Sequence, residues 1–436
     1  MSVFTKDFLW GAATASAQIE GAWNVDGRTP SIWDVAPAGK IKNNDTCHDS
    51  CDHYHHYKED VTLMKEMGLK SYRFSISWSR VIPEEGKVNP KGLQFYSDLV
   101  DELITNGIEP MVTIFHWDLP VWVYKKGGWL SEAIIPLFAE YTKVVVEALS
   151  DRVKYWMPMN EPQCFIMNGY MQGAHAPFKH QYLALSKLTR ICMLTHAEAV
   201  KTVRKYAKQP VKVGIAMAAG AFIPKDDSAE ALEEARRKTF YDGLGTMGNR
   251  WWCDPIFKGE PVTAYGVYRS RKKDMPKIKC DLDFVGVNVY QPFLDGSWGN
   301  KPAQGDPDRL TSMGWVIDGR VLYYTIKFFH ERYGLPVLVT ENGMADNDIV
   351  SVDGKVHDEK RIRFIHEYLG GVKRAVSEGI PVLGYQYWSL LDNFEWAEGY
   401  EPRFGMIHVD YKTQKRTLKD SAQAYKQIIE TNGEDL

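Results

Sequence analysis

Two glutamates far apart in the chain have neighbours that suit them to acid–base and nucleophilic chemistry. Glu161 lies in an Asn-Glu-Pro segment, and Glu341 lies in a Glu-Asn-Gly segment 180 residues further on. Each follows a short apolar run, and each is next to an asparagine that can donate and accept hydrogen bonds. In one polar cleft, such a pair of carboxyl groups could act on a glycosidic bond. On separate loops they would be ordinary surface or ion-paired side chains.

The fold must therefore bring residues 161 and 341 together, and the hydrophobic pattern indicates how. Eight short, nearly continuous apolar runs occur at 8–15, 71–77, 108–115, 153–159, 211–218, 284–290, 336–340 and 382–388. Such runs are typical of parallel strands buried on both faces. Helical patterns lie between or after them, at 57–67, 90–106, 134–149, 182–207, 229–248, 321–333, 359–377 and 418–431.

Eight strand–helix units without a low-complexity linker predict an α/β fold, a single (β/α)8 barrel that forms one catalytic domain over residues 1–436. An open, doubly wound sheet is the competing architecture. It would normally have a glycine-rich phosphate loop after its first strand, and GAATASAQ at 11–18 does not match GxGxxG. In a barrel, the fourth and seventh predicted strands, which precede the two glutamates, lie across the mouth from one another.

In a barrel of this type the active site lies at the carboxyl ends of the strands. The polar and aromatic residues predicted there are Gln18, Glu20, Arg73, His116, Trp117, Asp118, Asn160, Glu161, Asn288, Tyr290, Glu341, Asn342, Trp388, Glu395 and Trp396. The fifth strand ends only in Ala218, Ala219 and Gly220 and offers no reactive group. The long irregular segment 291–319 is expected to lie over the mouth and to shape a ligand site.

Composition narrows the class of protein. The net charge of −3 over 436 residues argues against a surface that binds nucleic acid. The chain has no run of about eighteen apolar residues that could span a membrane. The N-terminus lacks the pattern of a secretory signal, so we expect a cytoplasmic protein. Six scattered cysteines predict reduced thiols rather than a disulfide framework. Aromatic residues make up 13% of the chain, and they suit both a core and the C–H faces of sugars.

Six separate blocks of the sequence resemble the signatures of glycoside hydrolase family 1. They occur in the same order as in that family and span nearly the whole chain: FLWGAATASAQIEGA (8–22), SYRFSISWSR (71–80), FHWDLP (115–120), NEP (160–162), VTENG (339–343) and WSLLDNFEW (388–396). The resemblance implies a retaining β-glycosidase, chiefly a β-glucosidase, on a (β/α)8 barrel that needs no cofactor or metal.

The resemblance also implies roles for single residues. Glu161 would be the general acid/base and Glu341 the nucleophile. Residues that would bind the hydroxyl groups of the cleaved sugar are Gln18, His116, Asn160, Glu395 and Trp396. Trp388 would form the floor beneath that sugar, and Trp315 would line the side of the leaving group. Arg73 and Tyr290 would contact the nucleophile, with Asn288 supporting the same network.

A retaining mechanism requires the two carboxyl groups to lie about 5–5.5 Å apart and to start in opposite protonation states. Arg73 and Tyr290 are expected to favour the charged form of Glu341. The charge on Glu341 is in turn expected to keep a proton on Glu161. The carboxylate of Glu395 would repel a phosphorylated sugar, so we expect a neutral sugar as substrate. We also expect some hydrolysis of β-galactosides and β-fucosides.

The expected partners are small β-glucosides or short β-linked oligosaccharides, without nucleic acid or membrane, and the sequence indicates no oligomeric state. Two alternatives remain: a transglycosylating β-glycosidase, in which an acceptor sugar outcompetes water, and a sugar-binding barrel without turnover. Intact Glu161 and Glu341 argue against the second.

The stretch CHDSCDHYHH at 47–56 is the other candidate for chemistry, as a metal site. Zinc needs about four converging ligands, and no second cysteine or histidine cluster follows. The resemblance places these residues at the start of the first barrel helix, where Asp52 could cap the helix and the histidines after it would point in different directions. We therefore favour a structural role, with metal binding as the minor alternative.

Overall fold

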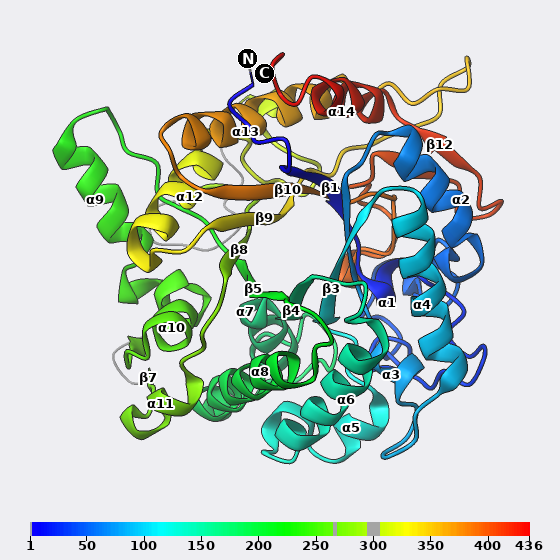
Figure 1. Ribbon diagram of the computed structural model, residues 1–436, viewed down its shortest axis with the longest axis vertical. Helices are drawn as coiled ribbons and strands as arrows, with labels where there is room; N and C mark the ends of the chain where they lie inside the picture. Colours follow the sequence, from blue (N-terminus) through cyan, green and yellow to red (C-terminus); the bar gives the residue numbers. More distant parts are fainter. Residues whose placement is uncertain (1, 265–267, 294–305) are drawn as a thin grey trace.

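Eight parallel strands close into a barrel surrounded by helices in the computed structural model (Figure 1). The structure describes residues 2–264, 268–293 and 306–436. The strands are β1 (Leu9–Ala13), β2 (Ser71–Ser75), β3 (Glu109–Phe115), β4 (Tyr155–Met159), β5 (Lys212–Ala218), β8 (Phe284–Asn288), β9 (Val337–Asn342) and β10 (Val382–Trp388). Their order around the barrel is β1-β10-β9-β8-β5-β4-β3-β2, and every neighbouring pair is parallel. The predicted (β/α)8 fold is confirmed.

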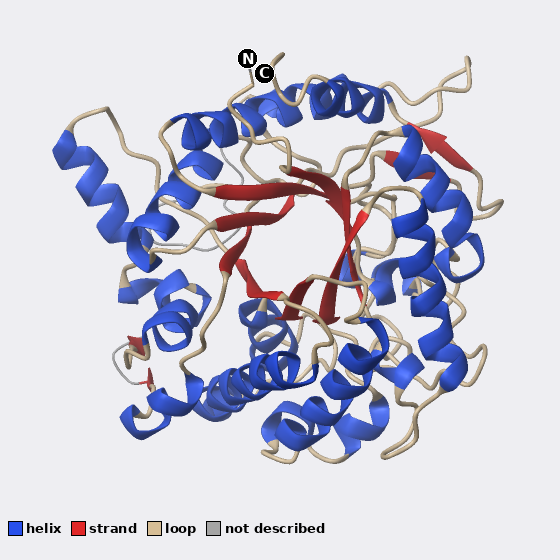
Figure 2. Cartoon of the chain, viewed as in Figure 1, coloured by secondary structure: helices blue, strands red, loops and turns tan. Residues whose placement is uncertain are grey.

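Helices form the outer ring (Figure 2). The longer ones are α2 (His53–Glu66), α4 (Pro90–Thr105), α6 (Ile134–Leu149), α8 (Leu185–Tyr206), α9 (Ala229–Thr239), α12 (Arg320–Tyr333), α13 (Glu359–Ser377) and α14 (Asp420–Glu430). Shorter ones are α1 (Ser16–Ile19), α3 (Trp78–Val81), α5 (Val121–Lys125), α7 (Pro162–Ile166), α10 (Asn249–Cys253) and α11 (Met275–Ile278). Two small antiparallel sheets lie outside the barrel, β6 (Thr263–Ala264) with β7 (Tyr268–Arg269), and β11 (Ile407–Val409) with β12 (Arg416–Leu418).

Two predicted segments differ from the observed elements in where they end. The predicted helix 229–248 is too long, because α9 ends at Thr239 and Gly245 adopts a φ of 64°, in the left-handed region that interrupts a helix. The predicted seventh strand is too short, because β9 continues to Asn342, where it still pairs with Tyr387 of β10. Glu341 therefore lies on the strand itself rather than on the loop after it.

Large apolar side chains close the amino-terminal end of the barrel. Met111, Met157, Phe284 and Leu338 come from four different strands, are fully buried and pack together inside the barrel. The ring of Phe284 fills the space beside Gly214, where a Cβ atom would lie 2.3 Å from it. Because this end is filled, a ligand cavity inside the barrel must open at the carboxyl ends of the strands.

A buried ionic cluster joins the loops after β9 and β10 to the last two helices. Its members are Asp348, Asp358, Arg361, Asp392, Arg403 and Lys419. Lys419 is fully buried and contacts Asp392 at 2.7 Å and also Asp348. Asp392 lies three residues before Glu395, so the cluster fixes the base of the loop that carries this predicted sugar-binding residue.

Replacing Lys419 by methionine is expected to lower the free energy of unfolding by about 3–5 kcal/mol, because it removes a buried cation from two buried carboxylates, Asp348 and Asp392, and leaves each with a single arginine partner. The measurement is urea or thermal unfolding of the purified variant. The matched control is Lys87→Met, whose ion pair with Glu84 is largely exposed and should change stability by at most about 1 kcal/mol. Equal stability of both variants would show that the buried ionic cluster contributes nothing.

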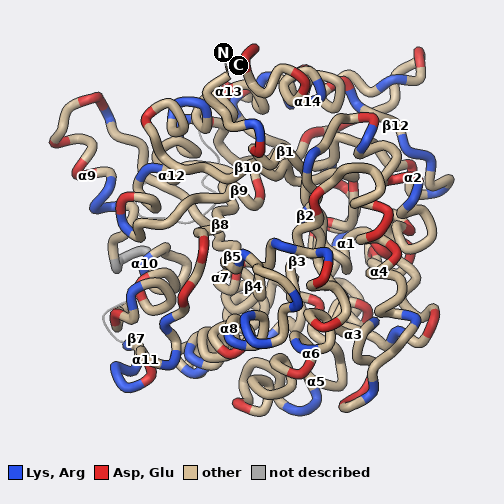
Figure 3. The backbone as a smooth tube through the Cα atoms, in the orientation of Figure 1, with Lys and Arg blue, Asp and Glu red and all other residues tan. Residues whose placement is uncertain are grey.

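Lys and Arg are interspersed with Asp and Glu over the outer helices, so neither sign dominates the view in Figure 3. Along residues 2–264, 268–293 and 306–436, the structure contains no helix with the length and apolar composition needed to cross a membrane.

Candidate active site

A cavity of about 570 Å³ opens at the carboxyl ends of the strands, within the size range of small-molecule sites. Predicted site residues that line it are His116, Glu161, Asn288, Tyr290, Trp315, Glu341, Trp388, Glu395 and Trp396. The other predicted residues, Gln18, Arg73 and Asn160, are fully or almost fully buried directly behind this lining and hydrogen-bond to it. The structure thus brings every predicted site residue to one place.

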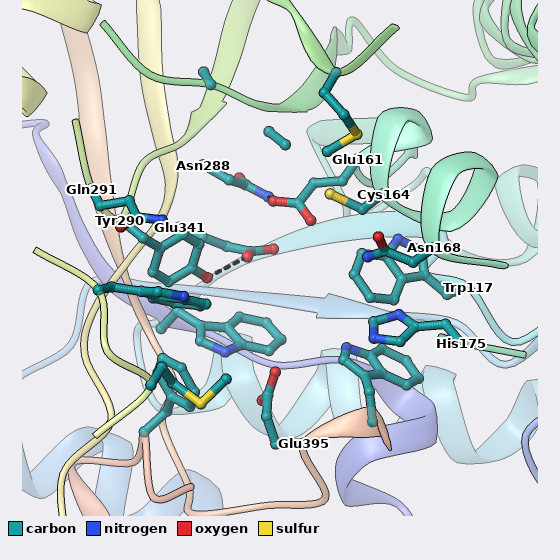
Figure 4. Close-up of a pocket in the computed structure, with 18 of the residues that line it drawn as sticks. Trp117, Glu161, Cys164, Asn168, His175, Asn288, Tyr290, Gln291, Glu341 and Glu395 are labelled. Carbon is teal, nitrogen blue, oxygen red and sulfur yellow. Dashed lines mark hydrogen bonds between the residues drawn. The ribbon is translucent and has the colours of Figure 1, made fainter. Parts of the chain in front are cut away.

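The carboxyl group of Glu341 is held by a cation and a phenol. Arg73, from β2, donates from Nη1 to Oε1 of Glu341 at 2.7 Å. The hydroxyl of Tyr290, two residues after the end of β8, donates to Oε2 at 2.7 Å (Figure 4). The contact with Arg73 is buried and the contact with Tyr290 is partly buried, so both orient the carboxylate and stabilise its charge.

Glu161 follows β4 at the turn into α7 and has a φ of 43°. Only a few per cent of non-glycine residues adopt such a positive φ, and strained residues of this kind cluster at functional sites. The side chain of Asn288 donates to Oε1 of Glu161 at 2.9 Å. Figure 4 shows the carboxyl groups of Glu161 and Glu341 pointing toward one another across the same cavity.

A continuous chain of polar contacts links the two glutamates. Oδ1 of Asn160 accepts from Nη2 of Arg73 at 2.6 Å and from Nδ2 of Asn288 at 3.0 Å. Asn288 also contacts Glu161, and Arg73 also contacts Glu341. Because each link is buried, displacement of one carboxyl group would disturb the position of the other.

The two carboxyl groups differ in their electrostatic environment. Burial raises the pKa of Glu161 well above its ordinary value, and the nearby charge of Glu341 raises it further. Burial also raises the pKa of Glu341, but the Arg73 guanidinium and the Tyr290 hydroxyl counteract this effect. Since Arg73 touches Glu341 directly, the proton that the pair retains resides on Glu161.

The far end of the cavity carries the predicted sugar-binding group Glu395. Nε2 of Gln18 donates to Glu395 Oε2 at 3.3 Å, and Oε1 of Gln18 has no partner among the described residues. Burial, followed by the charge of Glu341, raises the pKa of Glu395 to about 8. A carboxyl group with a raised pKa keeps its proton to higher pH, and in that form it can both donate and accept a hydrogen bond.

Aromatic rings form one wall of the cavity. The rings of His116 and Trp388 lie 5.6 Å apart at an interplanar angle of 28°, and those of Trp117 and Trp396 lie 4.8 Å apart at 27°. Nε2 of His116 contacts the amide of Asn160 at 2.9 Å. A wall of flat rings with polar edges suits the alternating C–H and hydroxyl surfaces of a pyranose.

Sequence reasoning missed several residues that line the cavity. Cys164, Asn168, Gln172 and His175 all follow Glu161 at intervals of three or four residues. That spacing is the signature of one helical face, so a helix starting at Glu161 could have predicted them. Residues from elsewhere that were also missed are Met247, Gln291, Pro292, Phe293, Met313, Glu398 and Phe404, whereas Trp117 was predicted at the end of its strand.

Some polar residues at the strand ends serve the fold instead. Glu20 pairs with Arg80 at 2.9 Å, away from the cavity lining. The side chain of Asn342 donates to the carbonyl of Val289 at 2.6 Å and accepts from the Tyr385 hydroxyl at 2.8 Å. These buried contacts join neighbouring strands around the nucleophile candidate.

The cysteine- and histidine-rich stretch 47–56 points in several directions. Cys47 contacts Asp34 and Cys51 contacts the carbonyl of Asp392. His53 pairs with Asp60 at 2.7 Å. Within the described ranges, no group of three or more His, Cys, Asp or Glu side chains is arranged to hold a metal ion.

The predicted helix cap at Asp52 is wrong. Asp52 does precede α2, but its side chain makes no capping hydrogen bond, and its φ of 47° is left-handed rather than extended. Oδ1 of Asp52 instead contacts Nδ1 of His55 at 2.6 Å.

Comparisons with known proteins agree with this geometry. The sequence model of glycosyl hydrolase family 1 matches residues 1–434. A 1,4-beta-D-glucan glucohydrolase of Thermotoga neapolitana is 42% identical over 99% of this chain and 99% of that protein. Beta-glucosidase A of Thermotoga maritima is 41% identical over 99% of this chain and 98% of that protein. The structure of a Thermotoga maritima beta-glucosidase in complex with deoxynojirimycin superposes with a TM-score of 0.89 at 40% identity, covering 99% of both chains. The chain therefore belongs to glycosyl hydrolase family 1.

Proposed function

We propose that the protein is a retaining β-glucosidase that releases terminal, non-reducing β-D-glucosyl residues by double displacement. The observation that carries this proposal is the pair Glu161 and Glu341, which face one cavity while a guanidinium contacts only Glu341. The printed names of the relatives, beta-glucosidase and glucan glucohydrolase, support the same substrate class. The whole chain acts as one catalytic domain, without a cofactor.

In the first step, a carboxylate oxygen of Glu341 attacks the anomeric carbon as its bond to the glycosidic oxygen breaks. Glu161 donates its proton to that oxygen, and the leaving alcohol departs. The sugar is then an ester of Glu341. For this geometry the carboxyl groups must lie about 5–5.5 Å apart.

In the second step, Glu161 removes a proton from water as the water oxygen attacks the anomeric carbon. The ester bond breaks, and Glu341 regains its charge. Esterification has removed the negative charge that raises the pKa of Glu161 in the free enzyme. The pKa of Glu161 therefore falls between the two steps, and the same residue changes from acid to base.

The glucosyl unit occupies the end of the cavity that contains Glu395. Its hydroxyl groups bind Gln18, His116, Asn160, Glu395 and Trp396, with Trp388 beneath the ring. Because several of these contacts are single hydrogen bonds, an epimeric hydroxyl weakens binding without abolishing it, so β-galactosides and β-fucosides are slower substrates. A 6-phosphate would meet the carboxyl group of Glu395, and no lysine or arginine among the described residues that line the cavity could pair with it.

A panel of 4-nitrophenyl glycosides tests the proposal: β-D-glucoside, β-D-galactoside, β-D-fucoside, β-D-mannoside and 6-phospho-β-D-glucoside. We expect the glucoside to be among the fastest and the phosphorylated sugar to be the slowest, with release of β-glucose as the first product seen by NMR. Fastest turnover of the 6-phosphoglucoside would contradict the substrate class. Release of α-glucose would contradict retention, and binding without turnover would indicate a sugar-binding barrel.

Replacing Tyr290 by phenylalanine is expected to lower kcat/KM about 10- to 100-fold, the value of a hydrogen bond to a charged group. The Tyr290 hydroxyl stabilises the carboxylate of Glu341, so its removal raises the pKa of that group. Since Glu341 must be charged to attack, the acid limb of the kcat/KM profile moves to higher pH. The control is Tyr206→Phe, at the end of α8 and outside the cavity lining. An unmoved acid limb would show that the hydroxyl does not tune Glu341.

A further inference from the structure

One buried carboxyl group beside the cavity has no part in the proposed reaction. Asp118 follows β3, two residues after His116, and is fully buried. His116 lines the cavity, whereas Asp118 is not part of the lining. The chain turns between these two residues, because Trp117 has a φ of 76°, in the left-handed region that few residues other than glycine adopt. Asp118 therefore lies behind the wall that His116 helps to form.

The carboxyl group of Asp118 connects the ends of three strands that are neighbours in the barrel, β1, β2 and β3 (Figure 1). Oδ2 of Asp118 accepts from Oγ of Ser16, the first residue of α1, at 3.2 Å. Oγ of Ser75, the last residue of β2, donates to Oγ of Ser16 at 3.1 Å and accepts from the backbone N–H of Ser16 at 2.7 Å. These contacts of Asp118, Ser16 and Ser75 form the Asp118 bridge.

The Asp118 bridge fixes the start of α1, which the helix cannot fix by itself. α1 has four residues, about one helical turn, and a helix of that length is not stable in isolation. Its N-cap residue is Ala15, whose side chain cannot accept a hydrogen bond from the first turn. The contacts of Ser16 with Ser75 and Asp118 take the place of a cap. Gln18 lies on the same turn as Ser16, so the position of Gln18 depends on the bridge.

Gln18 and His116, which the bridge joins, offer complementary polar atoms. Burial, followed by the charge of Arg73, lowers the pKa of His116 well below its ordinary value, so the imidazole is neutral. Nε2 of His116 contacts the amide nitrogen of Asn160, which only donates, so Nε2 accepts and Nδ1 carries the proton. Nδ1 of His116 and Oε1 of Gln18 have no partner among the described residues. One donor and one acceptor are what a sugar hydroxyl requires, provided that their separation is fixed.

We propose that Asp118 is a positioning residue: its hydrogen bond to Ser16 holds α1 against the turn after β3 and thereby sets the separation at which Gln18 and His116 bind the hydroxyls of the cleaved sugar. This inference rests on the proposed β-glucosidase function. Asp118 acts through two other residues and touches no substrate. Its loss should therefore weaken the recognition of particular hydroxyl groups of the sugar, whatever the leaving group is.

The surroundings of Asp118 suit a hydrogen-bonding group better than an ion. Burial raises the pKa of Asp118 to about 8; the charge of Arg28 opposes this effect and the charge of Glu20 adds to it. Oδ1 of Asp118 has no partner among the described residues, so a negative charge on this carboxyl group would be poorly stabilised. An uncharged amide of the same shape should therefore be able to replace the carboxyl group in the bridge.

The test is a cycle between variants and substrates, with 2,4-dinitrophenyl β-D-glucoside and its 2-deoxy, 3-deoxy, 4-deoxy and 6-deoxy analogues. Asp118→Ala should lower kcat/KM for the glucoside about 10- to 100-fold, because it disturbs two neutral hydrogen bonds that each correspond to a factor of about 2–13. The loss should be about 3- to 10-fold smaller for an analogue that lacks a hydroxyl bound by Gln18 and His116, since that contact is already absent.

Two further variants separate the bridge from the stability of the protein. Ser16→Ala removes one oxygen atom from the same hydrogen bond, so it should show the same dependence on the deoxy position as Asp118→Ala. The double variant should lose no more than Asp118→Ala alone, because both substitutions break one contact. Asp118→Asn keeps an oxygen that accepts from Ser16, so its kcat/KM should stay within about threefold of the wild type.

The matched control is Asp274→Ala, a buried aspartate in the outer ring that pairs with Arg190 at 2.7 Å and lies outside the cavity lining. Any loss that it causes should be the same for the glucoside and for all four analogues. Losses at Asp118→Ala and Ser16→Ala that are equal across the panel, or an Asp118→Asn variant as impaired as Asp118→Ala, would overturn this inference and leave the β-glucosidase proposal intact. If the wild-type protein hydrolyses no β-glucoside at all, the proposed function itself fails.

Discussion

Replacement of Glu341 by glycine is expected to lower kcat for every β-glucoside by on the order of 10⁴-fold or more. Removing the nucleophile of another covalent mechanism costs about 10⁶ in kcat, and here no other described carboxyl group is positioned to replace it. Glu395 lines the same cavity, but its pKa is raised to about 8 and it lies at the proposed sugar-binding end. The measurement is steady-state hydrolysis of an aryl glucoside by the purified variant.

Chemical rescue makes this prediction specific to the nucleophile. In Glu341→Gly, an added small anion such as azide can occupy the emptied space and attack the anomeric carbon from the same face, which gives an α-glucosyl azide. The control is Glu109→Gln, a partly buried strand glutamate at the opposite end of the barrel, whose pKa burial also raises. That control should keep wild-type activity. Rescue to a β-glucosyl azide, or a loss of less than about tenfold, would contradict the assignment.

The arrangement of strands could be predicted from the sequence because each strand is buried on both faces and reads as an apolar run. Their number and order follow from that signal together with the absence of a phosphate loop. The exact ends could not be predicted from hydrophobicity alone. At β9 the apolar run stops at Thr340, while backbone pairing with Tyr387 carries the strand on through Glu341. Hydrogen bonding between strands, which a local pattern does not record, sets that end.

The site was predictable where its residues follow strands and less so where they follow a helix. Glu161 and Glu341 stand out as polar groups after apolar runs. Asn168, by contrast, is a single amide in a segment of mixed polar and apolar residues. Its place in the cavity can be inferred only once Glu161 is known to precede a helix whose face lines the cavity. The spacing of seven residues was present in the sequence, but the starting point of the helix was needed to interpret it.

Electrostatics is the part of the site that sequence reasoning could not provide. Glu395 was expected to act as a charged carboxylate that binds sugar hydroxyls and repels a phosphate group. Its pKa depends on how deeply it is buried and how near it lies to Glu341, and the two together raise it to about 8. The same two causes act on Glu161. Three glutamates that look alike in sequence therefore differ in their electrostatic surroundings, because only Glu341 contacts the guanidinium of Arg73.

Replacement of Glu161 by alanine should slow hydrolysis by an amount that depends on the leaving group. Replacement of Glu341, by contrast, should slow the hydrolysis of every β-glucoside. General acid catalysis contributes about 10²–10⁴ to rate, and that amount should be lost for cellobiose, whose leaving sugar needs a proton. A 2,4-dinitrophenolate leaves without protonation, so formation of the covalent intermediate from its glucoside should remain fast. Turnover then stalls at the second step, in which no base activates water, and the measurement is a burst of dinitrophenolate followed by slow release.

The pH profile supplies the control on the same variant. Wild-type kcat/KM falls as pH rises through the raised pKa of Glu161, because the free enzyme then loses its acid; the alanine variant should lack this alkaline limb. Azide should accelerate its slow second step and yield a β-glucosyl azide, since attack occurs on the face opposite Glu341. An equal loss for both leaving groups, or an alkaline limb that survives the substitution, would mean that another group donates the proton. Asn288 could not do so, because its amide donates to the carboxyl group of Glu161 and has no acidic proton to transfer.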